Sequence, residues 1–211
     1  MSNLKIKVCG MRETENTWQV SQLKPDLLGF VFYPASPRYA GESPWKDLDE
    51  TIPAGIIKTG VFVDEDLYNI KAYVLRFGLQ AVQLHGNESP GTCKRLMDAG
   101  IRVIKAFRMS ENFDFQKMMP YIKCTTWFLL DTATKIPGGS GESFNWKLLK
   151  KYHWGHPFFL SGGIDLGDAE KILSLKHPSL IGVDINSKFE IEAGVKDVEK
   201  VKRFILKMRK V

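Results

Sequence analysis

The sequence predicts an α/β fold, a single-domain (β/α)8 TIM barrel spanning residues 1–211, and three observations favour it. Short apolar runs rich in β-branched and aromatic residues recur at regular intervals, segments with helical apolar spacing lie between them, and no long linker interrupts the series. Alternating strands and helices imply parallel strands with right-handed crossovers. Eight such units favour a closed barrel over an open sheet. The absence of a G-x-G-x-x-G motif after the first run weakens the dinucleotide-binding alternative.

The expected elements follow from these two periodicities, apolar runs for strands and three-to-four-residue apolar spacing for helices. Strands are expected at Leu4–Val8, Leu27–Phe32, Ile56–Phe62, Ala81–Leu84, Val103–Phe107, Trp127–Leu130, Phe158–Leu160 and Ile181–Ile185. Helices are expected at Arg12–Leu23, Asp66–Phe77, Ser89–Ala99, Phe144–Lys151, Leu166–Leu173 and Asp197–Met208, with weaker patterns near Trp45–Asp49 and Phe113–Tyr121.

Composition narrows the class of partner. Hydrophobic residues make up 44% and charged residues 26%, which is ordinary for a globular chain and excludes disorder. The net charge of +6 suits an anionic partner. Lys and Arg gather in the last expected helix, where they alternate with apolar residues as on the solvated face of an amphipathic helix. No nucleic-acid-binding motif accompanies them, so a small phosphorylated molecule is preferred to nucleic acid or a membrane surface.

The cysteines and the N-terminus indicate a reducing compartment. Cys9, Cys93 and Cys124 are odd in number and form no C-x-x-C pair, which fits neither a disulfide framework nor a redox motif. No apolar stretch has the length of a signal peptide core or a membrane span. We therefore expect a cytoplasmic protein. No His, Cys or acidic cluster has metal-ligand spacing, so no metal is expected.

Polar and glycine-rich residues follow the expected strands, where barrel enzymes place their chemistry. Two glycine-rich turns, Gly138–Gly141 and Gly162-Gly163, come after consecutive strands. Glycines let backbone N–H groups close around an anion, and barrels commonly bind phosphate after the seventh and eighth strands. Gly162, Gly163, Asn186 and Ser187 are the matching positions, although tight turns alone would also need glycine.

Cys9 differs from the other two cysteines because it ends a strand and precedes a glycine. Strand alternation places Lys5, Lys7 and Cys9 on one face, which should point into the barrel because the opposite face is apolar. A nearby ammonium would lower the pKa of the Cys9 thiol toward neutrality and prepare it to act as a base. The alternative is that Cys9 is a small buried hydrophobe.

Asp131 and Arg38 are the other chemical candidates. Asp131 ends the apolar sixth strand, where a carboxyl must be paired or must hold a proton and act as an acid. The first and sixth strands are separated around the ring, so Asp131 and Cys9 could address opposite sides of a substrate. Arg38 follows the second strand, where its guanidinium would bind a carboxylate or phosphate. A surface salt bridge remains open as its alternative.

Several blocks, in this order, resemble the phosphoribosylanthranilate isomerase family of tryptophan biosynthesis, and the resemblance runs from the first strand to the last. Together they are far more specific than any one block. The blocks are Lys7-Val8-Cys9-Gly10, Gly29-Phe30-Val31-Phe32 with Ser36-Pro37-Arg38, Gln83-Leu84-His85-Gly86, Leu130-Asp131 with Gly138-Gly139-Ser140-Gly141, Leu160-Ser161-Gly162-Gly163 and Val183-Asp184-Ile185-Asn186-Ser187.

The resemblance implies a cofactor-free Amadori rearrangement of N-(5-phosphoribosyl)anthranilate. Carried across, Asp131 is the general acid that opens the ribose ring and Cys9 the general base that removes the C2 proton. Arg38 would hold the anthranilate carboxylate. The remaining implied binding residues are those of the phosphate site (Gly162, Gly163, Asn186 and Ser187) and two supporting residues, His85 and Asp184.

Three rival readings remain. A sugar-phosphate isomerase of histidine or indole synthesis would share the barrel, but the histidine-pathway enzymes use paired aspartates and would replace Cys9 by aspartate. A non-catalytic phosphate-binding barrel would keep the glycine turns but could lose the acid or the base, whereas both are present. A thiol-nucleophile enzyme built on Cys9 would need a base such as His85, which the fourth strand places far round the ring.

Overall fold

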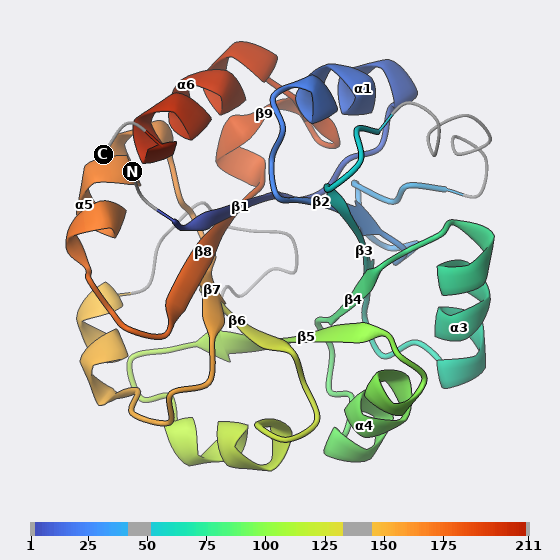
Figure 1. Cartoon of the computed structure of the whole chain (residues 1–211), viewed down its shortest axis with the longest axis vertical. Helices are drawn as coiled ribbons and strands as arrows, with labels where there is room; N and C mark the ends of the chain where they lie inside the picture. Colours follow the sequence, from blue (N-terminus) through green and yellow to red (C-terminus); the bar gives the residue numbers. More distant parts are fainter. Residues whose placement is uncertain (1–2, 42–51, 133–144, 210–211) are drawn as a thin grey trace.

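The computed structural model describes residues 3–41, 52–132 and 145–209, and its core is a closed barrel of eight parallel strands (Figure 1). The strands follow one another around the ring in chain order, and β1 closes it by pairing with β8. Helices lie outside this ring (Figure 1). The predicted (β/α)8 barrel is therefore confirmed. The strands are β1 Lys5–Val8, β2 Leu27–Val31, β3 Ile57–Phe62, β4 Ala81–Leu84, β5 Arg102–Met109, β6 Trp127–Thr132, β7 Phe158–Leu160 and β8 Leu180–Ile185.

Helical segments cover the barrel, and several begin at capping side chains. Asp66 accepts a hydrogen bond from the Tyr68 N–H at the start of α3, and Ser89 accepts one from the Thr92 N–H at the start of α4, where Pro90 fills the first position. The α-helices are α1 Thr14–Gln22, α3 Leu67–Arg76, α4 Pro90–Asp98, α5 Ala169–Ser174 and α6 Val198–Arg209. None of the helices in the described residues is long and apolar enough to cross a membrane.

Three expected helices take a different form. The segments predicted at 113–121 and 144–151 contain 3-10 helices, η1 Phe115–Tyr121 and η2 Trp146–Lys151. Pro120 lies inside η1 and cannot donate a helical hydrogen bond, which explains why that segment does not form an α-helix. The helix predicted at 166–173 is divided into η3 Leu166–Asp168 and α5. The helix expected near Trp45–Asp49 lies outside the described residues.

An antiparallel hairpin follows β8 and was not expected from the sequence. A short 3-10 turn, η4 Ser187–Phe189, leads into β9 Glu190–Glu192 and β10 Val195–Lys196. The turn between the two strands contains Gly194 at φ +90°, a conformation that favours glycine. The first and last residues of the hairpin, Glu190 and Lys196, place charged side chains near the barrel mouth.

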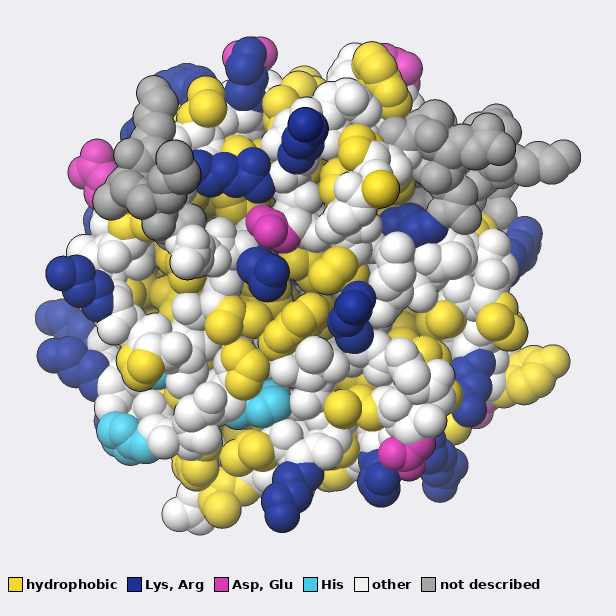
Figure 2. Space-filling view, viewed as in Figure 1, with side chains coloured by type: hydrophobic (Ala, Val, Ile, Leu, Met, Phe, Trp, Pro, Cys, Tyr) yellow, Lys and Arg dark blue, Asp and Glu magenta, His cyan; other side chains and the backbone are white. Residues whose placement is uncertain are grey.

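Buried apolar side chains form three clusters, of which the smallest, Cys9, Val31 and Val61, adjoins the cavity at the barrel mouth. The other two are larger. The larger lies between the strands and the helices, where α6 contributes Val201, Phe204, Ile205 and Met208. The smaller lies inside the barrel and comprises Leu27, Ile104, Ala106, Leu129 and Phe159. Lys and Arg side chains are spread over the face shown in Figure 2 rather than gathered in one continuous patch. The basic residues of α6 are thus the solvated side of a packed helix.

Gly182 of β8 allows a test of the close packing between β8 and β1, where the barrel closes. A Cβ there would lie 2.5 Å from the Lys5 carbonyl oxygen and 2.6 Å from Cε1 of Phe159, so the backbone must shift to admit it. We expect Gly182→Ala to lower the free energy of unfolding by about 1–3 kcal/mol, measured by denaturant titration. Gly167→Ala is the matched control because its Cβ would enter open space, and it should change stability by less than about 0.5 kcal/mol. Equal effects of the two substitutions would contradict this account.

Candidate active site

A cavity of about 250 Å³ lies at the carboxyl ends of the barrel strands and brings the candidate residues together. Residues that directly follow β1, β4, β7 and β8 converge there because parallel strands end on the same rim. Every site residue expected from the sequence lines this cavity, namely Cys9, Arg38, His85, Asp131, Gly162, Gly163, Asp184, Asn186 and Ser187. The cavity also takes in Tyr33, Gln83, Arg108 and Ser161.

Lys7 lies fully buried beneath the cavity, on the interior face as the alternation of β1 predicts. Its Nζ donates to Oδ2 of Asp184 at 2.9 Å, and the Cys9 thiol lies near enough to influence its pKa. Burial alone would lower the pKa of Lys7, but Asp184 and Cys9 together raise it, so the side chain stays an ammonium. A positive charge is therefore held permanently beside the thiol.

The pKa of the Cys9 thiol does not follow the expectation that Lys7 would lower it toward neutrality. Burial raises the pKa of Cys9, and this effect exceeds the lowering by Lys7; the carboxylate of Asp184 also raises it. The expectation was wrong in its net direction because desolvation of a thiolate at 4% residual exposure outweighs one neighbouring charge. Lys7 opposes the burial effect without cancelling it.

Gly29 of β2 makes the space in which this thiol and ammonium sit. A Cβ at Gly29 would lie 2.8 Å from Sγ of Cys9 and 3.0 Å from Nζ of Lys7. Both side chains therefore lean across the neighbouring strand at a point where it carries no side chain. The contact places the reactive groups of β1 against the backbone of β2.

Asp131, one residue before the end of β6, lines the cavity and is about one-quarter exposed. Nε2 of His85 lies 3.3 Å from Oδ2 of Asp131, and Nδ1 of the same ring lies 3.1 Å from Nε2 of Gln83. The contact with His85 gives Asp131 a partner, one of the two alternatives expected for a carboxyl at that strand end. His85 contacts Asp131 and Gln83, an arrangement that does not make it a partner of Cys9.

Arg38 is held by the unexpected hairpin. Its Nε and Nη2 donate to Glu190 at distances of 2.7 to 3.1 Å, and the arginine is only 8% exposed. Lys196, fully buried, donates to the same carboxylate and to Oδ1 of Asn186, both at 2.6 Å. The alternative of a surface salt bridge is wrong, because the pair is buried at the rim of the cavity.

The glycine turn after β7 has the backbone shape that the sequence suggested. Gly162 and Gly163 both have positive φ, at +87° and +66°. A Cβ on Gly162 would lie 2.5 Å from the backbone nitrogen of Thr132, so no larger residue fits the turn. Asn186 and Ser187 lie on the same cavity wall. The second glycine-rich turn, Gly138–Gly141, lies outside the described residues.

Sequence reasoning missed Glu190 and Lys196. They belong to strands of three and two residues, which are too short to produce a periodic signal. Gln83 was part of a block expected at the mouth but received no role, although it precedes His85 by two residues and so shares its face of the chain. In the parts of the chain that are described, no group of three His, Cys, Asp or Glu side chains could hold a metal ion.

Glu190 makes the hairpin sensitive to acid. Burial raises the pKa of this carboxyl, but Arg38 and Lys196 together lower it by more. The net pKa is therefore below its ordinary value. The stabilisation is present above the unfolded-state pKa of about 4.3 and is lost as pH falls through the lower folded-state pKa. We expect Glu190→Gln to destabilise the protein by up to about 3–5 kcal/mol at pH 7, and by less as the pH falls toward 3.

Denaturant titrations across this pH range would measure the difference. Glu192→Gln, on an exposed residue of the same hairpin, controls for the loss of one negative charge. A stability difference for Glu190→Gln that stays constant with pH would contradict the assignment.

Comparison with known proteins identifies the family. Residues 6–207 match the family described as N-(5'phosphoribosyl)anthranilate (PRA) isomerase. Over 204 residues the chain is 41% identical to the N-(5'-phosphoribosyl)anthranilate isomerase of Phocaeicola vulgatus, covering 97% of each chain. The phosphoribosyl anthranilate isomerase of Thermotoga maritima has a similar crystal structure, with a TM-score of 0.89 at 32% identity over 99% of this chain and 100% of that one.

A second solved structure of such an isomerase is similar with a TM-score of 0.84, at 29% identity over 99% of this chain and 100% of that one. That protein was crystallised in complex with reduced 1-(o-carboxyphenylamino)-1-deoxyribulose 5-phosphate. The family match and the 41% identity each extend over almost the whole chain. This chain therefore belongs to the N-(5'-phosphoribosyl)anthranilate isomerase family, whose members are isomerases of tryptophan biosynthesis.

Proposed function

We propose that the protein catalyses the Amadori rearrangement of N-(5-phosphoribosyl)anthranilate to 1-(2-carboxyphenylamino)-1-deoxyribulose 5-phosphate, the third step of tryptophan synthesis from chorismate, using no cofactor. The observation that carries the proposal is the placement of Cys9 directly after β1 and of Asp131 near the end of β6, both lining one cavity. The bound ligand of the related crystal structure is a reduced form of this product, which supports the assignment of the substrate class.

Asp131 acts as the general acid in the first step. It donates its proton to the ribose ring oxygen, the C1–O bond breaks, and the anilino nitrogen supplies the electron pair that forms the iminium. A carboxylic acid can accept a hydrogen bond through one oxygen while it carries its proton on the other. The contact from His85 to Oδ2 is compatible with that arrangement and orients the carboxyl.

Cys9 acts as the general base in the second step. Its thiolate removes the proton from C2 of the iminium, the C–H electron pair forms the C1–C2 double bond, and the resulting enolamine tautomerises to the ketone. Burial favours the neutral thiol, so the base form is scarce in the free enzyme near neutral pH. The ammonium of Lys7 and the positive charge that develops on the substrate both favour the thiolate.

Binding of the substrate uses the rest of the rim. We assign the phosphate to the turn at Gly162 and Gly163 together with Asn186 and Ser187, because glycines leave backbone N–H groups accessible to an anion. Arg38 is assigned to the anthranilate carboxylate, with its guanidinium fixed by the hairpin. These residues suit a ligand with an anionic group at each end.

Asp184 and His85 take supporting roles in this scheme. Oδ1 of Asp184 is buried at the cavity wall and has no hydrogen-bond partner among the described residues. An acceptor in that situation is costly unless a ligand satisfies it, so we assign it a hydroxyl group of the ribose chain. His85 orients Asp131.

The rivals fit the cavity less well. A paired-aspartate isomerase would need a carboxyl where Cys9 stands. A thiol nucleophile would need a base at Cys9, whereas the His85 ring contacts Asp131 and Gln83. A barrel that only binds phosphate would have no use for an acid and a base that face each other across the cavity.

An activity assay tests the proposal. With N-(5-phosphoribosyl)anthranilate generated in situ, the protein should accelerate the loss of the substrate's fluorescence. Cys9→Ala and Asp131→Asn should each lower kcat by about 10²–10⁴-fold, the usual contribution of a general base or acid, and should still bind the reduced product. Cys93→Ala, in α4 and away from the cavity, is the control and should keep its activity. Absence of turnover by the parent, or a near-parental rate for either site variant, would refute the assignment.

The pH profile tests the state of the thiol. Because the pKa of Cys9 is raised, the thiolate population should grow with pH from neutral into the alkaline range, measured as thiolate absorbance in a Cys93→Ala/Cys124→Ala background. Lys7→Met removes the charge that opposes burial, so this titration should move to higher pH. An unchanged Cys9 pKa in Lys7→Met would exclude a tuning role for Lys7.

A further inference from the structure

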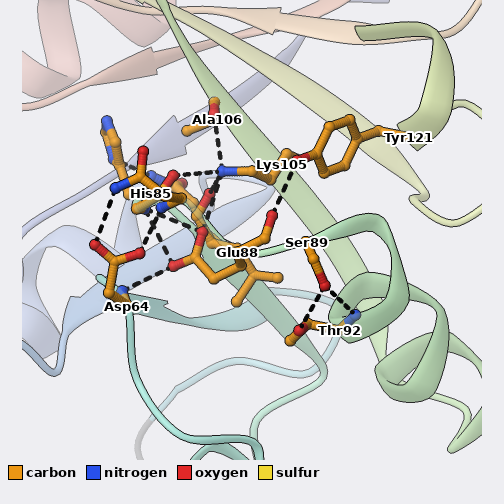
Figure 3. Close-up of polar contacts among 12 residues, drawn as sticks. Asp64, His85, Glu88, Ser89, Thr92, Lys105, Ala106 and Tyr121 are labelled. Carbon is orange, nitrogen blue, oxygen red and sulfur yellow. Dashed lines mark hydrogen bonds and ion pairs between the residues drawn. The ribbon is translucent and has the colours of Figure 1, made fainter. Parts of the chain in front are cut away.

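We propose that Glu88 and Lys105, a buried ion pair behind the rim of the barrel, are positioning residues that hold His85 against Asp131. The inference rests on the proposed function, because it takes Asp131 as the general acid. Nζ of Lys105 lies 3.1 Å from Oε2 of Glu88, and each side chain is 3% exposed. Figure 3 shows this cluster beside His85 at the end of β4.

Lys105 fixes the backbone on both sides of His85. From β5 its Nζ donates to the carbonyl oxygens of Leu84, at 3.1 Å, and Gly86, at 2.8 Å, which are the residues before and after the histidine. A third bond, to the Ala106 carbonyl at 3.2 Å, ties the same ammonium to its own strand. One charged group thus binds the turn that carries His85 to the rigid edge of β5.

Glu88 accepts hydrogen bonds from N–H groups in and beside the same turn. Its two carboxylate oxygens each accept from the Gly86 N–H at 3.1 Å, and Oε1 also accepts from the Asp64 N–H at 2.9 Å. The Asp64 carboxylate in turn accepts from the Asn87 N–H. The peptide units after His85 are therefore held through both their N–H and their carbonyl groups.

Close packing leaves this turn little freedom to move. A Cβ at Gly86 would lie 2.6 Å from the backbone nitrogen of Asp64. Asp64 itself has φ +52°, a left-handed conformation that costs energy for a residue other than glycine. The His85 N–H also donates to the Phe62 carbonyl at 2.8 Å. The turn is thus anchored to both β3 and β5.

The anchored backbone presents the imidazole to Asp131 in one orientation. The Gln83 amide nitrogen can donate only, so Nδ1 of His85 accepts from it and the ring carries its proton on Nε2. That Nε2 lies 3.3 Å from Oδ2 of Asp131. A displacement of about 1 Å at a catalytic group costs up to roughly 10²-fold in rate, so the anchor of His85 has a kinetic consequence.

The pair can be tested by removing both charges together. Replacing a buried ion pair by apolar residues of similar volume is often neutral for stability, whereas removal of one partner leaves an uncompensated charge. We expect Glu88→Leu/Lys105→Met to lower kcat by roughly 10- to 10²-fold with KM little changed. Added to His85→Asn, the same double substitution should cause no further loss, because its effect passes through the histidine.

A spectroscopic readout separates positioning from general stability. The ¹⁵N chemical shifts of the His85 ring should indicate the Nε2–H tautomer in the parent and averaging of tautomers in Glu88→Leu/Lys105→Met. Tyr121→Phe is the control, because the Tyr121 hydroxyl donates to the main-chain oxygen of Glu88 and touches neither peptide unit flanking His85. It should leave kcat and the ring signals unchanged. If that variant does not fold, Glu88→Gln/Lys105→Gln removes both charges with polar side chains of similar size and provides the same readouts.

Three results would overturn the proposal. These are an unchanged kcat in the folded double variant, losses that multiply in the His85→Asn background, or unaltered ring signals in the double variant. A separate measurement identifies failure of the underlying function. If Asp131→Asn retained turnover, the assignment of Asp131 as the acid would itself be wrong. If Asp131→Asn were inactive but the losses from the double substitution and His85→Asn multiplied, only the positioning role would be rejected.

Discussion

The register between β1 and β8 closes the barrel, and the same register sets the charge beneath its mouth. Lys7 is the Cα partner of Asp184 across this seam, and their side chains meet at 2.9 Å with almost no exposure to solvent. Cys9 continues the strand through its N–H bond to the Ile185 carbonyl. A shift of one residue would turn the lysine toward the helices and separate all three groups. The register that closes the barrel therefore also determines the charges around the thiol.

Buried charges recur around the rim. Lys7, Lys105 and Lys196 are each at most 3% exposed, and each meets a carboxylate within 3.1 Å. Such pairs add little net stability, because desolvation offsets much of the attraction. Their location indicates what they provide instead. Each one fixes a segment that ends at the cavity: the β1 strand end, the turn after β4, and the hairpin after β8.

The sequence predicted those features that depend on periodicity. Recurring apolar runs located the strands, and parallel topology then required Cys9, His85, Asp131 and Asp184 to share one rim. Features that depend on contacts between distant segments were not predictable. Nothing in the sequence around Glu190 indicates that it binds a residue 152 positions earlier. The direction of the Cys9 pKa shift was missed for a related reason, because alternation reveals Lys7 as a neighbour but not how completely water is excluded.

Gly29 shows how a residue with no functional group can determine the chemistry of a site. The thiol of Cys9 and the ammonium of Lys7 occupy the volume that any side chain at this position would fill. Position 29 is therefore closed to variation for a steric reason while lying on a strand that contributes no acid, base or charge of its own there. Efforts to alter the specificity of this cavity by diversifying its wall must leave that backbone bare. The absence of a Cβ atom at Gly29 therefore helps to define the shape of the cavity.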